Sequence, residues 1–248
     1  MKKMVINSFY NTLIDKEDAI PLSTMLEIER IRKSGNKFVI LTNRSAEELT
    51  FYNRDFPFID YIIAFNGNYV LDVENNKCLL DTKLREEDIE LIKEKYPNHS
   101  KLFYSLDKSY CEDILCTDVY KIEIELKPRE VKKIELINND YIKSSIFIYN
   151  KKTYLEITSA KSNNCKAVEI LMRLEEITKK DVITILGNDS EINLLKYIKE
   201  SYVVSNAKEI KKLATYKTKS SNAKGSENII KKIQWISHIF HNQIIVLK

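Results

Sequence analysis

Short apolar runs of strand length alternate with amphipathic stretches of helical spacing at the start of this 248-residue chain. Met4–Ile6 and Phe38–Leu41 are the apolar runs, and residues 22–33 between them repeat apolar side chains at the spacing of a helix. Gly35 follows that stretch, in the place where a glycine typically ends a helix. Strand, helix and strand in this order form the unit of parallel sheets, because parallel strands need a crossover between them. The order predicts an α/β fold.

The alternation continues along the chain and is interrupted once. We expect a helix from about Ser45, a strand over residues 61–64, a turn at 66–68 and a hairpin of residues 69–72 and 77–80. From residue 167 on we expect helices over 167–176, 194–198 and 226–241, and strands over 182–186 and 202–204. The parallel core is therefore predicted to be interrupted and then completed.

The middle of the chain has a different pattern. We expect a charged helix over 86–96, a strand with alternating polar and apolar residues over 121–126, a short helix over 129–137, and a hairpin of residues 145–149 and 153–157. Antiparallel strands with a solvated face are typical of a small α+β domain. We predict a core domain of residues 1–82 and 155–248, with an inserted α+β domain of residues 83–154.

Charge and composition narrow the function classes. Lys and Arg number 40 against 36 Asp and Glu, and the excess is spread along the sequence, which gives no support to a nucleic-acid or membrane partner. No apolar run approaches the roughly 18 residues of a membrane span, so we expect a cytoplasmic protein. The four cysteines form no C-x-x-C pair and the three histidines are not at zinc spacing. The sequence does not predict the oligomeric state.

Polar motifs follow the predicted strands. These are Asn11–Leu13, Ile40–Arg44, Asn66–Gly67, Leu155–Ile157, Gly187, Val204–Ala207 and Ser220–Gly225. Together they resemble the motifs of the haloacid dehalogenase (HAD) superfamily, in particular its Cof-type sugar-phosphate phosphatases, over nearly the whole chain. The resemblance implies a Rossmannoid parallel sheet flanked by helices and an inserted cap domain. It also implies that the chain re-enters the core at Leu155–Ile157 and that Mg²⁺ lies over the carboxyl ends of the strands.

The resemblance also implies two carboxylates at the end of the first strand, one as nucleophile and one as general acid and base. Alignment on Thr12–Leu13 places these two catalytic positions on Ser8 and Tyr10. A serine has no candidate base nearby in the sequence, and a tyrosine with a pKa of about 10 is a poor proton shuttle near neutrality. We also predict that Tyr10 partly fills the pocket. Asn11 replaces the glycine of the motif, and because asparagine tolerates left-handed backbone, we expect the loop shape to persist.

The phosphate-binding positions are better retained. The resemblance assigns phosphate binding to Thr42 at the end of the second strand, with Asn43 beside it, and substrate contact to the turn at Asn66 and Gly67. Arg44 is the best basic candidate for phosphate binding, and the alternative is that it pairs with a carboxylate such as Glu47 or Glu48. The lysine of the third motif falls on Asn164. Lys161 and Lys166 flank it in the sequence, but in a helix Lys166, two residues further on, points about 200° away from Asn164.

The fourth motif reads Gly187–Ile192 and supplies the remaining acidic residues. Asp189 and Glu191 are the candidate metal ligands, and we expect them to hold Mg²⁺ weakly if at all, because the other carboxylates of the family pattern are absent.

Three functions remain open. The leading hypothesis is a catalytically impaired Cof-type protein, a pseudoenzyme, that binds a phosphorylated metabolite or a partner in the cleft between core and cap. An active Mg²⁺-dependent phosphatase with a rewired site that uses Asp15, Asp189 or Glu191 is the second. The third is an interaction module that acts through the aromatic residues of the cap, which are Phe103, Tyr104, Tyr110, Tyr120 and Tyr149.

Overall fold

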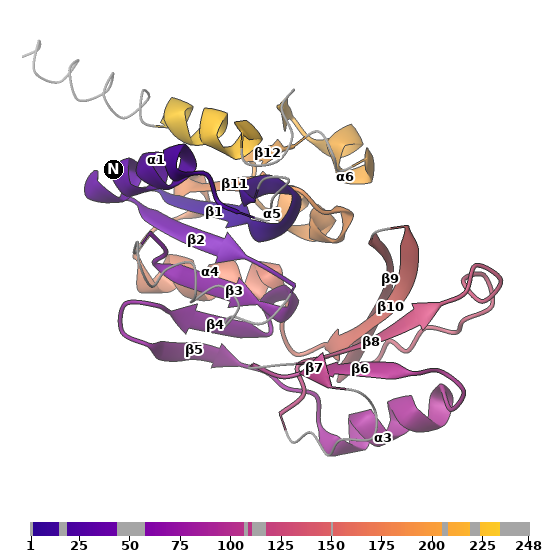
Figure 1. Cartoon of the computed structure of the whole chain (residues 1–248). Helices are drawn as coiled ribbons and strands as arrows, with labels where there is room; N and C mark the ends of the chain where they lie inside the picture. The colour runs from indigo at the N-terminus through magenta and orange to yellow at the C-terminus, as the bar shows by residue number, and fades with distance from the viewer. Residues whose placement is uncertain are drawn as a thin grey trace, which may run out of the picture. The chain divides into compact units, whose positions relative to one another are not determined.

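The computed structural model of the chain describes residues 2–14, 19–43, 58–106, 109–110, 118–149, 151–204, 208–218 and 224–233. The helix expected from Ser45 lies outside these residues. Figure 1 shows the arrangement of the helices and strands.

In the described part of the chain, the first sheet has eight strands in the order β13-β12-β11-β1-β2-β3-β4-β5. β1 pairs in parallel with both β2 and β11, and the pairing continues in parallel through β12 to β13. β4 and β5 form the predicted antiparallel hairpin. The strands are β1 (Met4–Ser8), β2 (Lys37–Leu41), β3 (Tyr61–Ala64), β4 (Tyr69–Asp72), β5 (Lys77–Asp81), β11 (Val182–Leu186), β12 (Ser201–Val203) and β13 (Tyr216–Lys217). The parallel order confirms the predicted α/β fold.

Among the residues described, the second sheet has five strands in the order β7-β6-β8-β10-β9, and their pairings are antiparallel. The strands are β6 (Lys101–Tyr104), β7 (Ser109–Tyr110), β8 (Lys121–Leu126), β9 (Ile142–Tyr149) and β10 (Lys152–Ser159). Helix α3 (Glu86–Lys95) contributes Ile89 and Ile92 to a core that includes Ile122 and Leu155. A cap-like α+β region therefore exists, and the division at residues 83 and 154 stays a prediction.

Two local predictions in this region are wrong. Leu155–Ile157 does not re-enter the first sheet, because β10 continues to pair with β9 as far as Ser159. Residues 128–133 form turns and not a helix. The chain after these turns contacts β9. Asn138 forms a bridge with Lys143, and the backbone N–H and carbonyl of Ile137 both form hydrogen bonds with the hydroxyl of Ser144.

Helix α1 (Leu22–Lys33) has the predicted bounds, and Gly35 after it has a φ of +82°. Its buried face is different from the expected apolar stripe, because Leu22 is 64% exposed while Thr24 is fully buried. The reason is that this end of α1 contacts the helix of residues 224–233, where Glu227 accepts a hydrogen bond from Ser23 at 2.9 Å. The other helices are α4 (Asn164–Leu174), α5 (Ile192–Tyr197) and α6 (Lys208–Leu213).

The chain divides into two compact units. Unit 1 consists of Met1–Leu41, Asp55–Ile62 and Val168–Lys248, and unit 2 of Thr42–Arg54 and Ile63–Ala167. The division passes through β3 and α4. Each unit is described below by itself.

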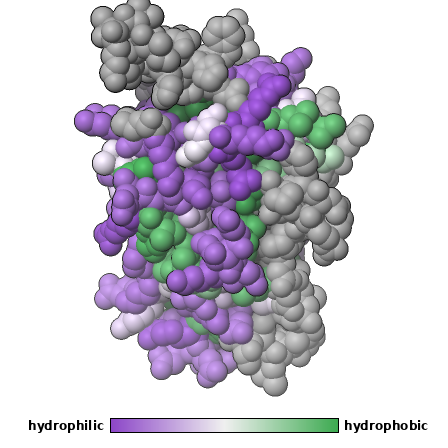
Figure 2. Space-filling view, turned by 90° about the vertical axis from the view of Figure 1, so that its left-hand side faces the viewer, coloured by the Kyte–Doolittle hydropathy of each residue, from purple (hydrophilic) through white to green (hydrophobic). Residues whose placement is uncertain are grey.

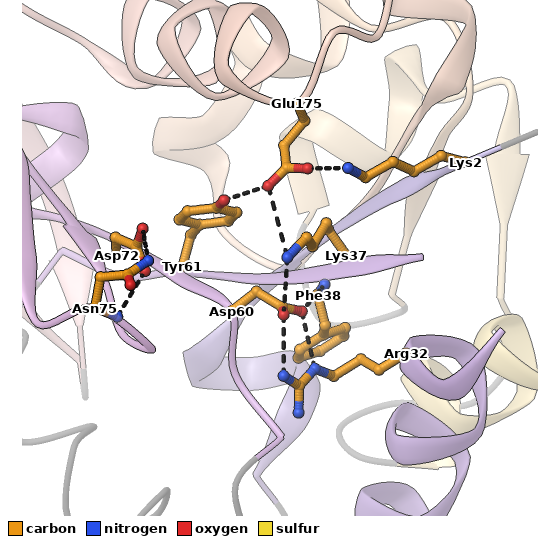
Figure 3. A network of polar contacts seen from close by, with 9 residues as sticks. All are labelled: Lys2, Arg32, Lys37, Phe38, Asp60, Tyr61, Asp72, Asn75 and Glu175. Carbon is orange, nitrogen blue, oxygen red and sulfur yellow. Dashed lines mark hydrogen bonds and ion pairs between the residues drawn. The ribbon is translucent and has the colours of Figure 1, made fainter. Parts of the chain in front are cut away.

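A network of charged side chains lies in unit 1 at the amino ends of the parallel strands (Figure 3). Arg32 holds the carboxylate of Asp60 with two hydrogen bonds of 2.9 and 3.0 Å. Lys37, the first residue of β2, lies 3.6 Å from Asp60 and 3.7 Å from Glu175. Glu175 also pairs with Lys2 and accepts a hydrogen bond from Tyr61. The network connects the start of β1, β2 and β3 to the end of α4. It lies at the ends of the strands that are opposite to the sequence motifs.

On the face drawn in Figure 2, hydrophilic residues predominate among those described and separate the hydrophobic ones into small patches. None of the helices in the described ranges is long and apolar enough to span a membrane.

Candidate functional site

A first group of candidate residues lies in unit 1, where β1 ends. Ser8 is the last residue of β1 and is completely buried. Its hydroxyl donates a hydrogen bond of 2.6 Å to Oε1 of Glu191, which is 183 residues away in the sequence. The serine therefore does face a carboxylate, although the sequence offered no partner for it.

The loop after β1 keeps a left-handed residue, as predicted. Asn11 has a φ of +64°, and its amide donates to Oδ1 of Asn188 at 2.9 Å. The next residue, Thr12, donates to the carbonyl of Ser8 and packs so closely against Gly187 that a Cβ there would clash with its methyl group. The loop is thus fixed by residues that follow β11.

Glu191 is 5% exposed and its carboxylate has four hydrogen-bond donors. Besides Ser8, they are the backbone N–H groups of Gly187 and Asn188, both at 3.0 Å, and the side-chain amide of Asn188 at 3.4 Å. Burial raises the pKa of Glu191, and these donors only partly offset the effect. The side chain faces into the protein.

Asp189, the other candidate metal ligand, is exposed and has a different partner. Its Oδ1 accepts a hydrogen bond of 2.9 Å from the backbone N–H of Ile210 in α6. The carboxylates of Glu191 and Asp189 therefore contact different parts of unit 1: that of Glu191 lies at the ends of β1 and β11, and that of Asp189 contacts α6.

The oxygen atoms near the end of β1 are poor ligands for Mg²⁺. Mg²⁺ requires a near-octahedral shell of oxygens and is usually held by one or two carboxylates. Here Ser8 contributes a neutral hydroxyl, the oxygens of Glu191 accept hydrogen bonds from the protein, and Asp189 is bonded elsewhere. In the described part of the chain, no three His, Cys, Asp or Glu side chains are grouped to hold a metal ion. The described residues do not fit the resident Mg²⁺ that the resemblance implies.

Tyr10 follows two residues after Ser8 and is partly buried. Its ring lies edge-on to that of Phe9, with the ring centres 4.9 Å apart. That it fills part of a ligand pocket stays a prediction. Asp15 and Arg44 lie outside the described residues.

A second group of candidate residues lies in unit 2. Thr42, directly after β2, is 5% exposed, and its backbone N–H donates to the carbonyl of Ile63 at 2.9 Å. The carbonyl of Asn43 accepts a hydrogen bond of 2.9 Å from Nζ of Lys121, in β8. Thr42 is thus held at the end of its strand, as the motif requires.

The turn after β3 has three successive residues with positive φ, at +50° for Phe65, +56° for Asn66 and +89° for Gly67. A bulky residue rarely adopts this conformation. Here the ring of Phe65 stacks on the ring of Tyr120, with the ring centres 4.8 Å apart. Asn66 donates to Oε1 of Glu156 at 2.6 Å. Gly67 lies against the backbone of Asn163 and leaves no room for a Cβ. The predicted turn is therefore present and constrained on every side.

Asn164, at the position of the third-motif lysine, is the first residue of α4 and is 9% exposed. Its Oδ1 is buried without a hydrogen-bond partner. Lys166 is exposed and its Nζ donates to the carbonyl of Lys161 at 2.9 Å. The two side chains have opposite environments, as the helical spacing predicts.

Sequence reasoning missed a buried ion cluster in unit 2. Lys121 is 1% exposed, and its Nζ lies 2.6 Å from Glu123 and 3.8 Å from Glu156. Its Nζ also lies 4.0 Å from the ring centre of Tyr104, whose hydroxyl donates to Glu123 at 2.6 Å. Burial raises the pKa of Glu156, and the charge of Lys121 acts against this. The alternation in residues 121–126 predicts a solvated polar face of β8. Glu125 on this face is exposed as predicted, whereas Lys121 is buried and its Nζ donates to the carbonyl of Asn43.

The fold and these motifs are those of the haloacid dehalogenase-like hydrolases. The family model of haloacid dehalogenase-like hydrolases matches residues 11–123 and 93–230, and the chain belongs to this family. Its placement in the Cof-type branch, which the sequence predicts, stays a prediction.

Similar proteins cover nearly the whole chain. A protein of Haemophilus influenzae that is provisionally named a phosphatase is 24% identical over 91% of this chain and 95% of its own length. The provisionally named phosphatase YxeH of Bacillus subtilis is 21% identical over 93% and 97%.

Among solved structures, a Streptococcus mutans protein has a TM-score of 0.81 at 17% identity, over 94% of this chain and 99% of its own. The HAD subclass IIB sugar phosphatase BT4131 has a TM-score of 0.73 at 17% identity, over 94% and 99%. At these identities the structures establish the fold.

Proposed function

We propose that this protein binds a phosphorylated metabolite and does not hydrolyse it by the carboxylate mechanism of its family. The observation that carries the proposal is the hydrogen bond of 2.6 Å between Ser8 and Glu191. A neutral hydroxyl stands where the family places its nucleophile, and the one carboxylate that it contacts is held by three further donors. Losing an essential nucleophile typically removes many powers of ten in rate.

Binding is supported by the positions that unit 2 retains. Thr42 offers a hydroxyl at the end of β2, and the turn at Asn66 and Gly67 is rigid. Asn164 lies in the first turn of an 11-residue helix, where backbone N–H groups and the helix dipole favour an anion. Its buried amide has an oxygen without a partner, and an amide side chain can present either its oxygen or its NH₂ group to a ligand. These groups suit a phosphate ester better than an apolar ligand.

The proposal is tested by calorimetric titration of sugar phosphates, each with its unphosphorylated sugar as a control. We expect the phosphorylated member of a pair to bind and the free sugar not to. Thr42→Val should weaken the binding by about tenfold, which corresponds to about one hydrogen bond to a charged group, whereas Thr42→Ser should retain it. Equal affinity of the phosphorylated and the free sugar would contradict a phosphate site.

A phosphatase with a rewired site is the second candidate, and one observation favours it. The carboxylate of Glu191 is placed to accept the proton of Ser8, so a serine nucleophile has a base within 2.6 Å. In that case the protein releases phosphate from sugar phosphates with many turnovers, and Ser8→Ala abolishes the release. The same assay with Asp189→Ala tests the other acidic residue of the fourth motif.

An interaction module that acts through cap aromatics has less support. Phe103 and Tyr120 are 3% and 0% exposed, so they belong to the interior of unit 2. The side chains of Tyr110 and Tyr149 lie outside the described part. A protein partner therefore remains an outcome to examine only if no metabolite binds.

A further inference from the structure

At the end of β1, both oxygens of the buried carboxylate of Glu191 accept hydrogen bonds from protein groups, whereas in a cation site such oxygens would bind the ion. Oε1 of Glu191 accepts from the hydroxyl of Ser8, and Oε2 accepts from two backbone N–H groups, those of Gly187 and Asn188. These contacts join the last residue of β1 to the first residues after β11. They are the connections that a cation would make if it bridged the two strand ends.

The neighbouring polar groups have partners as well. Oδ1 of Asn188 accepts from Asn11, and Oδ1 of Asp189 accepts from Ile210. The buried Oδ1 of Asn7 is an exception, since it has no partner, while the NH₂ group of the same side chain donates to the carbonyl of Ser8. Most oxygens that Mg²⁺ would need are therefore already bonded to protein donors.

The charges lead to the same conclusion. Carboxylates crowded at one strand end repel each other and repel a phosphate, so that they need a cation. In this chain positions 8 and 10 are a serine and a tyrosine. The substitutions that remove the nucleophile also remove the repulsion that a cation would have to offset.

We infer that the Ser8–Glu191 hydrogen bond replaces the divalent cation at this end of β1, so that neither folding nor ligand binding depends on Mg²⁺. The part on ligand binding rests on the proposed function, and the part on folding does not. One consequence is specific: a carboxylate at position 8 would face Glu191 directly and would recreate a need for a cation.

Thermal unfolding of the intact protein tests the inference. The wild type, Ser8→Asp and Ser8→Ala are melted in EDTA and in millimolar MgCl₂, with NaCl added to match the ionic strength. We expect the wild-type midpoint to be the same in both buffers. Ser8→Asp should melt several degrees lower in EDTA and recover in MgCl₂, because Mg²⁺ then bridges two carboxylates. Ser8→Ala should melt lower in both buffers, since it loses the hydrogen bond but gains no charge.

A wild-type midpoint that rises with MgCl₂, or a Ser8→Asp variant whose loss Mg²⁺ does not restore, would overturn the inference. A second measurement needs no variant. Mn²⁺, which prefers ligands like those of Mg²⁺, is titrated into the wild type and followed by its EPR signal. We expect the signal of free Mn²⁺ throughout. One Mn²⁺ bound per chain and displaced by Mg²⁺ would contradict the inference, whichever residues held it.

Calorimetry with glucose 6-phosphate and inorganic phosphate as probes separates the inference from the proposed function. Equal affinity in EDTA and in MgCl₂ supports both. Binding only in MgCl₂ overturns the inference and leaves the proposed function intact. If neither probe binds in either buffer, the result counts against the proposed function, and the melting and EPR experiments decide the inference by themselves.

Discussion

Gly35 and Gly67 have nearly the same backbone conformation but different surroundings. Their φ angles are +82° and +89°, a region in which any other L-residue is strained. Around Gly35 there is open space for a Cβ, whereas at Gly67 a Cβ would overlap the backbone of Asn163. An alanine at position 35 would therefore have only a strained backbone, whereas an alanine at position 67 would have a strained backbone and a steric overlap as well.

This difference gives a prediction at the residue scale. Gly35→Ala should lower the free energy of unfolding by about 1 kcal/mol, the usual penalty for a left-handed alanine. Gly67→Ala should lower it by about 2 to 4 kcal/mol, because backbone must also move. Urea denaturation of both variants measures the two costs. Equal losses would mean that the turn at Gly67 is not held against α4.

Residue-scale prediction from sequence succeeded where the information was local. The left-handed conformation of Asn11 follows from its replacement of a motif glycine, whereas the complete burial of Ser8 was not predicted. The partner of Ser8 could not be predicted, because Glu191 is 183 residues away and only the pairing of β1 with β11 brings it close.

At the scale of elements, the second sheet carries two lysine–glutamate pairs with very different burial. The side chain of Lys121 in β8 is 1% exposed and contacts Glu123, while that of Lys152 in β10 is 57% exposed and contacts Glu125. The sequence pattern of β8 does not distinguish such pairs, since an alternating strand shows which face is polar and not what covers it.

The two lysines form a matched pair of tests. Lys121→Met should lower the free energy of unfolding by about 3 to 5 kcal/mol, because Glu123 and Glu156 would remain buried without their cation. Lys152→Met should leave the stability within error of the wild type, because water solvates the partner. Chemical denaturation compares them. A small loss for Lys121→Met would show that the cluster is open to solvent.

The network at the amino ends of the parallel strands leads to a pH prediction. Burial alone would raise the pKa of Glu175, but hydrogen bonds from Lys2 and Tyr61 hold the pKa below its ordinary value of 4.5. Because the folded pKa is the lower one, the contribution to stability is complete above pH 4.5 and is lost as the pH falls through the folded pKa.

Glu175→Gln should therefore destabilise the protein at neutral pH, by about 1 kcal/mol, and the difference from the wild type should shrink in acid. Thermal melts of both proteins between neutral and acidic pH measure the difference. A difference in stability between the two proteins that stays constant with pH would show that the network does not depend on the charge of Glu175.

At the scale of the whole molecule, the order of strands and helices was predictable because it depends on many residues at once. The parallel sheet, the hairpin of β4 and β5 and the antiparallel second sheet all follow from runs and alternations of apolar residues. The fate of residues 129–137 and of Leu155–Ile157 was not predictable, because pairing at β9 and β10 overrides local preference. Contacts with a neighbouring strand decide these segments.

The central claim is that a phosphatase fold has kept ligand binding and lost turnover, and phosphorus NMR tests both halves in one experiment. The protein is mixed with an excess of glucose 6-phosphate in MgCl₂, and the resonances of the ester and of free phosphate are followed with time. We predict that the ester signal broadens or shifts with protein concentration while no inorganic phosphate accumulates. Inorganic phosphate that exceeds the protein many times over, and that is absent with Ser8→Ala, would contradict the account.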